Sequence, residues 1–169
     1  DVYLGKMKKI FILLAGTIAL FSLWLLGLEK VYAHILKFGA SILLSPFSNV
    51  TPVLKTELTH PDFCVAVGTE GYCMQLELFG LSIIVMLSWY IMMLMLNSSK
   101  KMFFIAAKHL FIFYFLQILT MASLALYEYG AFFQQLNNAL RQSFIIIALG
   151  FIIWDNYLHG IFKFGSKKA

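Results

Sequence analysis

The chain has 169 residues, of which 61% are hydrophobic and 12% are charged, and its formal net charge is +5 at pH 7. An ordinary soluble domain carries about twice this share of charged residues, so the composition excludes that class. The lysines stand beside apolar blocks instead of along a patch interleaved with aromatic residues, which argues against nucleic acid as a partner. The composition predicts a single membrane domain, residues 1–169, whose first partner is the lipid bilayer.

The first predicted element is an apolar span at about residues 10–28, which follows the basic pair Lys8 and Lys9. Such a segment is either an uncleaved anchor or a cleavable secretory signal, and Val31-Tyr32-Ala33 has the small-residue character of a cleavage site. We favour the anchor, because the apolar region is longer than the core of a typical signal.

Residues 29–46 form the second predicted element, in which Lys30, His34 and Lys37 are interleaved with large apolar residues. This pattern predicts an amphipathic helix that lies in the membrane interface. Residues 47–72 follow as a polar loop that contains short alternating and β-branched stretches and the turn sequence Gly68-Thr69-Glu70-Gly71. We expect this loop to form a small hairpin or cap.

Three further apolar segments predict spans at about residues 74–96, 102–126 and 137–162. Basic residues gather before the first span, between the second and third, and after the fourth: Lys6, Lys8, Lys9, Lys100, Lys101, Lys163, Lys167 and Lys168. The positive-inside rule then places both termini in the cytoplasm and the polar loop outside. The expected fold is an all-α integral membrane protein with four transmembrane helices, an amphipathic interfacial helix and a small extracytoplasmic β-like cap loop.

The two cysteines, Cys64 and Cys73, lie in or beside the outside loop, in a compartment that favours disulfides. A disulfide between them would stabilise the cap by about 2–4 kcal/mol, chiefly by restricting its unfolded ensemble. The other hypothesis keeps Cys73 as a free nucleophile, which requires a nearby cation or base to lower its pKa.

Glu77 follows Cys73 by four residues, which places both side chains on one face if the segment is helical. A carboxylate at the edge of a membrane is costly unless it is paired or wet, and Arg141 is the obvious counter-charge. A structural ion pair and a catalytic role both stay open. We expect an outward-facing pocket lined by polar residues of similar predicted depth: Glu77, Gln117, Thr120, Asn137 and Arg141.

Other ionisable residues belong to the predicted cytoplasmic half, too far from Cys73 for joint chemistry. His109 is expected to be a packed or interfacial histidine, and Asp155 and His159 a pair at the membrane edge. The sequence has no metal-spaced cluster, glycine-rich phosphate loop or serine elbow, so we expect no metal and no cofactor.

The order of these features resembles the exosortase/archaeosortase family, particularly its short stand-alone members. The resemblance covers roughly residues 53–154 and implies a membrane-embedded cysteine transpeptidase that processes carboxy-terminal sorting tails. That family carries a Cys-Asn/Ser-Gly signature, a later Arg and a later His. The stretch Gly71-Tyr72-Cys73-Met74-Gln75-Leu76-Glu77 keeps the cysteine and the glutamate, but Met74 and Gln75 stand in place of the small polar residue and the Gly. Thr120 replaces the Arg, and asparagine replaces the His in Leu136-Asn137-Asn138.

Without a cation or a base, Cys73 would be an ordinary thiol at neutral pH. The expected function is therefore that of a non-catalytic, degenerate exosortase-like subunit in a bacterial cytoplasmic membrane, with other membrane or envelope proteins as partners. The alternative is a cysteine protease or transpeptidase with Cys73 as nucleophile, Arg141 stabilising the oxyanion and Glu77 orienting it. A small transporter component is a third hypothesis, which is weakened because the spans lack a continuous polar stripe.

Overall fold

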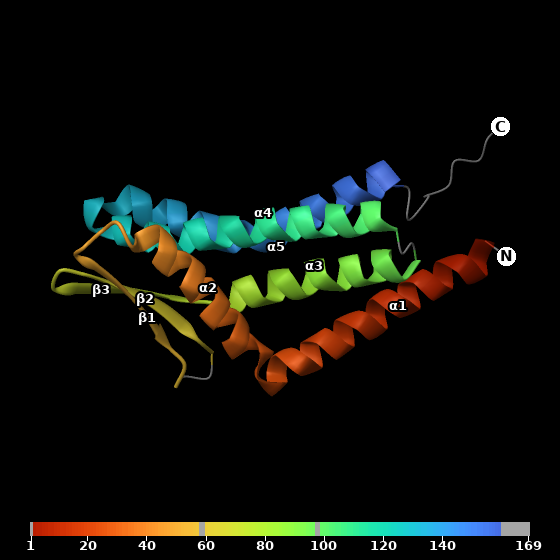
Figure 1. Ribbon diagram of the computed structural model, residues 1–169, viewed down its shortest axis with the longest axis horizontal. Helices are drawn as coiled ribbons and strands as arrows, with labels where there is room; N and C mark the ends of the chain where they lie inside the picture. The colour runs from red at the N-terminus through yellow and green to blue at the C-terminus, as the bar shows by residue number, and fades with distance from the viewer. Residues whose placement is uncertain (1, 58–59, 97–98, 160–169) are drawn as a thin grey trace.

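A computed structural model describes residues 2–57, 60–96 and 99–159. Four helical segments are long and apolar enough to cross a membrane: Met7–Leu44, Glu77–Leu96, Lys100–Tyr127 and Ala131–Leu158. A small three-stranded sheet lies at one end of the molecule, and the chain's N-terminus lies at the other end (Figure 1). The expectation of four apolar helices with a small β-structured cap is confirmed.

The first helical segment is sharply bent. α1 (Val2–Leu23) passes through a π-helical turn, η1 (Trp24–Leu28), into α2 (Glu29–Leu44). The bend lies at Gly27, whose φ of 119° is a conformation that side chains with a Cβ rarely adopt. As a result α1 packs along α3 (Glu77–Leu96), whereas α2 turns away toward the sheet and packs on α4 (Lys100–Ala122) (Figure 1).

The sheet is antiparallel in the order β1 (Val50–Lys55), β2 (Asp62–Val67) and β3 (Glu70–Gln75). A two-residue turn joins β2 to β3, and Gly68 there has a φ of 60°, as such hairpin turns require. Phe63 and Val65 of the central strand are fully buried. The third strand includes Met74 and Gln75, so the second apolar helix begins at Glu77 and not at the predicted residue 74.

The remaining helices run back and forth along the long axis of the molecule (Figure 1). Ser99 caps α4 by accepting a hydrogen bond of 3.2 Å from the amide of Met102. A 3-10 turn, η2 (Ser123–Tyr129), follows α4, and Gly130 at φ 125° turns the chain into α5 (Ala131–His159). α5 therefore begins before the predicted residue 137, and the predicted end of this span at 160–162 lies outside the described residues.

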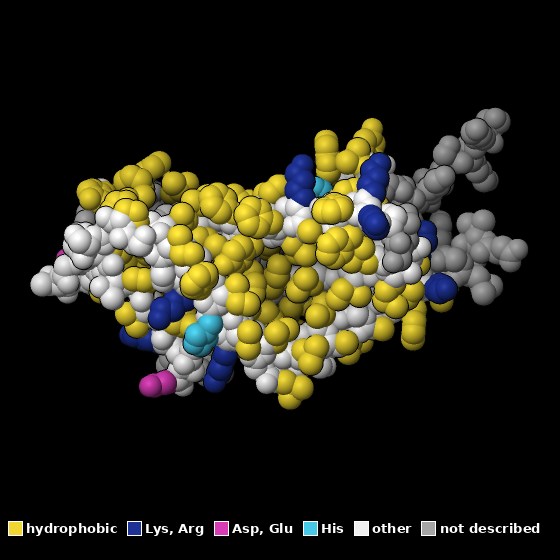
Figure 2. Space-filling model, in the orientation of Figure 1, with side chains coloured by type: hydrophobic (Ala, Val, Ile, Leu, Met, Phe, Trp, Pro, Cys, Tyr) yellow, Lys and Arg dark blue, Asp and Glu magenta, His cyan; other side chains and the backbone are white. Residues whose placement is uncertain are grey.

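The core centres on α3, whose Phe79, Met86 and Met92 are fully buried. Phe79 packs edge-to-face on Phe144 of α5, with ring centroids 4.7 Å apart, and Phe113 of α4 meets the same ring at 5.5 Å. Away from this core, hydrophobic side chains cover the middle of the surface, and basic side chains gather on either side of them (Figure 2).

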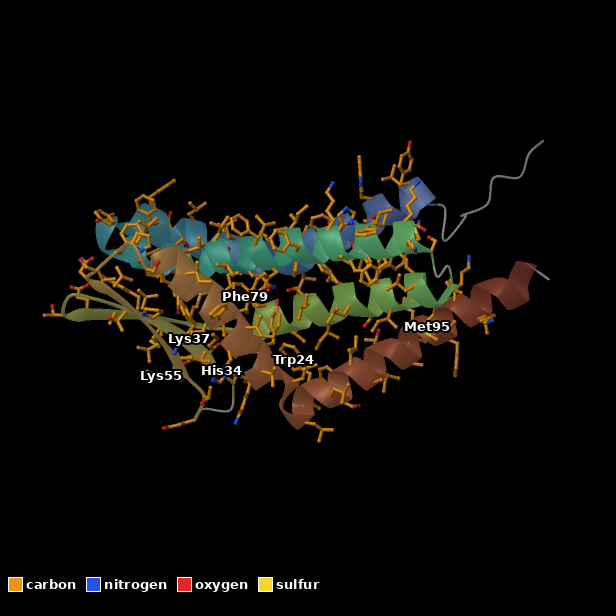
Figure 3. The ribbon with its side chains drawn as sticks, viewed as in Figure 1. Trp24, His34, Lys37, Lys55, Phe79 and Met95 are labelled. Carbon is orange, nitrogen blue, oxygen red and sulfur yellow. A yellow bond between two sulfur atoms is a disulfide. The ribbon has the colours of Figure 1, made fainter. Side chains whose placement is uncertain are left out.

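Trp24 joins the bend of the first segment to the beginning of α3, as Figure 3 shows. Its indole lies directly on Gly80, where an added Cβ would stand 2.2 Å from Cζ2 of the ring. The two helices can approach this closely only because residue 80 has no side chain.

Replacing Gly80 with alanine is expected to lower the free energy of unfolding by about 1–3 kcal/mol, because the new methyl group must displace the buried indole of Trp24. Thermal unfolding in detergent micelles measures the change. Gly16→Ala on α1 is the matched control, because nothing lies within 4 Å of a Cβ built there. Equal midpoints for the two variants would contradict the close contact.

Candidate functional site

The two cysteines are joined. Cys64 on β2 and Cys73 on β3 stand opposite each other in the hairpin, and their Sγ atoms form a disulfide. The predicted disulfide is confirmed, and the sulfur of Cys73 is therefore not a free thiolate. Cys73 lies on a strand that ends before α3 begins, so the helical face that it was predicted to share with Glu77 does not exist.

Glu77 and Arg141 do not form the predicted ion pair. Within the described residues, the ion pairs join His60 to Glu29, at 3.2 Å, and His109 to Asp155, at 3.1 Å. Glu77 is exposed in the first turn of α3, where the helix dipole favours a negative charge. Arg141 is partly exposed on α5, and its positive charge lies near Tyr127.

Gln117 is fully buried on α4 and connects three helices. The hydroxyl of Tyr32, on α2, donates a hydrogen bond to Oε1 of Gln117. The Nε2 of Gln117 donates to the carbonyl of Phe79, at 3.3 Å, and to Oγ of Ser82, at 3.2 Å, both on α3. Because its oxygen and nitrogen both have partners, this amide holds α2, α3 and α4 in a fixed register.

Asn137 makes a second polar cluster, between α5 and the end of α4. Its Nδ2 donates to the carbonyl of Thr120, at 2.7 Å, and to Oγ of Ser123, at 2.8 Å. Its Oδ1 accepts from the hydroxyl of Tyr127, at 2.8 Å. The hydroxyl of Thr120 donates to the carbonyl of Leu116 in its own helix. The structure thus brings Thr120 and Asn137 together, but as packed and hydrogen-bonded residues.

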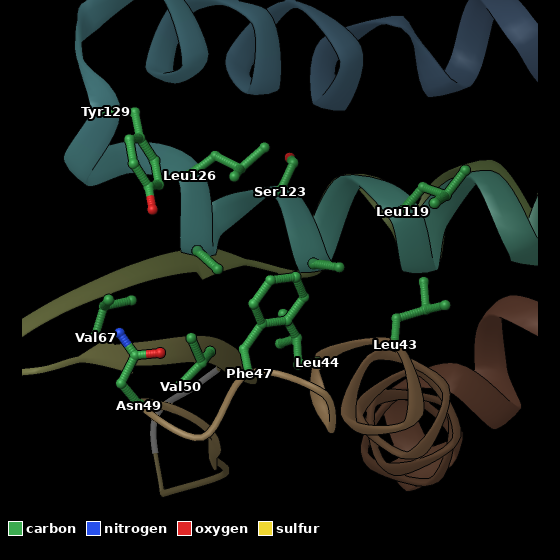
Figure 4. A pocket seen from close by; sticks show the side chains of 12 residues that line it. Leu43, Leu44, Phe47, Asn49, Val50, Val67, Leu119, Ser123, Leu126 and Tyr129 are labelled. Atoms are coloured by element: carbon green, nitrogen blue, oxygen red, sulfur yellow. The ribbon is translucent and has the colours of Figure 1, made fainter.

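An apolar cavity of about 460 Å³ lies beside these clusters, where the end of α2, the first two strands and η2 meet (Figure 4). Polar side-chain atoms in its lining come only from Asn49, Ser123 and Tyr129. The remaining lining residues are aliphatic or aromatic: Leu43, Leu44, Phe47, Val50, Val67, Leu119, Ala122, Ala125 and Leu126. Its volume lies in the range of sites that bind small ligands.

A buried polar cluster also occurs toward the opposite end of the bundle. Asp155 is completely buried, and its Oδ2 accepts hydrogen bonds from the hydroxyl of Tyr90, at 2.8 Å, and from Nδ1 of His109, at 3.1 Å. Asp155 therefore pairs with His109, while the predicted pair of Asp155 with His159 involves a side chain outside the described residues. Sequence reasoning placed these groups at similar depth, but it did not identify Tyr90 as the third member.

The cavity was not predicted either, because its walls come from segments that each have an ordinary reason to be apolar. Leu43 and Leu119 read as helix-packing residues and Val67 as a strand residue. Only the fold shows that they surround an unfilled space. Comparison with models of known protein families, with curated proteins and with solved structures finds no match.

Replacing Gln117 with methionine is expected to lower the free energy of unfolding by about 1–2 kcal/mol, because Tyr32 and Ser82 lose a buried partner. Denaturation in mixed micelles measures this loss. Gln142→Met on the exposed side of α5 makes the same chemical change without removing a buried hydrogen bond. A loss at residue 142 as large as that at residue 117 would contradict the proposed helix connection.

Proposed function

We propose that this protein is a non-catalytic integral membrane subunit that binds an apolar segment of another membrane or envelope protein in the cavity at its sheet end. The apolar lining of that cavity is the observation that carries the proposal. The resemblance to exosortases supports a bacterial cytoplasmic membrane and a degenerate member of that family.

Membrane insertion is supported by helix length and surface. The 20 residues of α3 extend about 30 Å, which equals the thickness of the hydrocarbon layer. Large apolar side chains on the other helices are mostly exposed, including Phe11 at 73%, Phe104 at 71% and Ile146 at 71%. Lipid accommodates such a surface, whereas water would drive it to aggregate.

The exposed lysines support one orientation of the protein in the membrane. Lys8, Lys100 and Lys101 are exposed at the end of the bundle opposite the sheet. The acidic residue described near that end, Asp155, is buried, so the accessible charge there is basic. By the positive-inside rule this end faces the cytoplasm, and the sheet and cavity face outward. The predicted contribution of Lys163, Lys167 and Lys168 lies outside the described residues.

The depth of the cavity favours a protein partner over bulk lipid. Gln117 is level with the first turns of α3, because it bonds to Phe79 and Ser82. The cavity residues of α4 and η2 start at Leu119 and continue to Tyr129, which takes them past the outer end of α3. In the proposed orientation this cavity lies at or beyond the extracytoplasmic interface of the membrane that the helices span. Acyl chains of the bilayer do not extend to this level, so an apolar peptide segment is the better candidate to fill the cavity.

A binding function also fits the chemistry of the outer end. The catalytic alternative needs the thiolate of Cys73, which is bonded to Cys64. Thr120 and Asn137, at the positions where the family has Arg and His, are a hydroxyl and an amide that hydrogen bond to neighbouring groups. A hydroxyl and an amide supply neither the positive charge that stabilises a thiolate nor the base that accepts its proton.

Replacing Cys64 or Cys73 with serine is expected to have the same effect, because each change removes the same disulfide from the cap. Both variants should lose about 2–4 kcal/mol of stability in the cap, and partner assembly should fall by the same amount in each. Partner assembly in membranes and resistance of the cap to limited proteolysis measure the two effects. A much greater functional loss for Cys73→Ser than for Cys64→Ser, at equal protein levels, would favour the cysteine-enzyme alternative.

A photo-crosslinking residue at Leu126, which lines the cavity, is expected to capture a discrete membrane or envelope protein in native membranes. Ala125→Phe should abolish this adduct, because its ring would fill the cavity that Ala125 lines. Ala139→Phe on the exposed side of α5 is the matched control and should leave the adduct intact. Adducts to lipid alone, or a protein adduct that survives Ala125→Phe, would contradict the proposal.

A further inference from the structure

A groove of about 400 Å³ runs between α4 and α5 near the end of the bundle opposite the sheet. Lys108 and His109 from α4 and Trp154 from α5 line it together with apolar residues. Lys108 and Trp154 are exposed, and the side chain of His109 is 13% exposed. The proposed function does not use this groove, which is separate from the outer cavity in all of its lining residues.

Polarity changes along the groove in one direction. α4 runs toward the sheet and α5 runs away from it, so Ile112 and Ile147 line the part of the groove nearer the middle of the bundle (Figure 1). Lys108 and Trp154 line the part nearer the basic end. A cation and an indole at one end and aliphatic side chains at the other match the headgroup and the acyl chain of a phospholipid.

His109 is held in place from behind the groove. Its Nδ1 lies 3.1 Å from Oδ2 of Asp155 and 3.0 Å from the hydroxyl of Tyr90. The ring of Phe151 packs on it, with centroids 5.1 Å apart. Because the hydrogen bonds to both partners use Nδ1, Nε2 is the ring nitrogen left for a ligand in the groove. The buried Asp155 thus orients the imidazole without itself reaching the groove lining.

Gly150 keeps the groove open. A Cβ built on it meets no heavy atom within 4 Å, so a larger side chain would enter the open space without colliding with the protein. The absence of a side chain there leaves a path for an acyl chain between α4 and α5.

We propose that this groove binds one anionic phospholipid of the cytoplasmic leaflet. The phosphate lies against the Lys108 ammonium at the basic end, and an acyl chain follows the aliphatic part of the groove past Gly150. The charge of Lys108 and the direction of the polarity gradient select this occupant over an apolar helix, which would leave Lys108 against an uncharged surface. The inference rests on membrane insertion in the proposed orientation, but not on the outer cavity or its partner.

Native mass spectrometry of the purified full-length protein tests this inference with phosphatidylglycerol, phosphatidylcholine and soluble glycerol 3-phosphate as probes. The wild type is expected to retain phosphatidylglycerol over phosphatidylcholine. Lys108→Gln should weaken phosphatidylglycerol binding about five-fold, the effect of one cation near a headgroup. Lys101→Gln, an exposed lysine of α4 outside the groove, is the matched control and should change binding less than two-fold.

Gly150→Leu provides an independent variant that keeps every charge. It should reduce retention of the lipid by filling the chain path, whereas Gly16→Leu, in equally open space on α1, should not. Equal retention of both lipids by the wild type, or equal losses in Lys108→Gln and Lys101→Gln, would overturn the inference. Binding of glycerol 3-phosphate as tight as that of the lipid would also overturn it, because the site would then recognise free phosphate. None of these results bears on crosslinking at the outer cavity, so the two proposals fail separately.

Discussion

The constraint on which the structure depends is that polar groups inside an apolar helix bundle must be paired within it. In the proposed membrane setting, burial of apolar surface contributes little to the choice of partner between helices, so specific hydrogen bonds and close contacts set the register. Gln117 does this for α2, α3 and α4, and Asn137 does it for α5 against the end of α4. The contact of Trp24 with Gly80 adds a steric limit between the first helical segment and α3.

The two ends of the bundle differ in chemistry. At the sheet end, the end of α2, the first two strands, the end of α4 and η2 line an apolar cavity. At the other end, Asp155 and Tyr90 orient His109 toward a groove that also contains Lys108. A residue at the sheet end therefore has different surroundings from a residue of the same type at the opposite end. The proposed partner segment and the proposed lipid are recognised by apolar shape in one case and by charge in the other.

Much of the fold was predictable from the sequence because long apolar helices leave strong local signals. The apolar blocks predicted the four long helices, and the change from apolar to mixed residues near Glu29 predicted that a new element starts there, although the bend at Gly27 itself was not predicted. The Gly68 turn and the two cysteines similarly predicted the hairpin and its disulfide. Helix starts were less predictable, since Met74 and Gln75 fit an apolar helix as well as a strand and only pairing with β2 decides between them.

The candidate sites were harder to predict because they depend on distances across the fold. Depth alone suggested that Glu77 and Arg141 would meet, but depth does not specify which side of a helix a residue occupies. The same limit hid the contact between His109 and Asp155, which lie on helices adjacent in space and 46 residues apart in sequence. The cavity had no local signal at all, because an unfilled space is a property of the assembled walls.

Both proposals require that the sheet and its cavity face outward and that the lysine-rich end faces the cytoplasm. Labelling of single engineered cysteines by a membrane-impermeant maleimide on intact cells tests it most directly. Ser48→Cys lies beside the cavity residue Phe47, and Lys101→Cys lies at the opposite end, while the native cysteines stay blocked by their disulfide. We expect residue 48 to react on intact cells and residue 101 to react only after permeabilisation. The reverse pattern, or reaction of both on intact cells, would contradict this orientation.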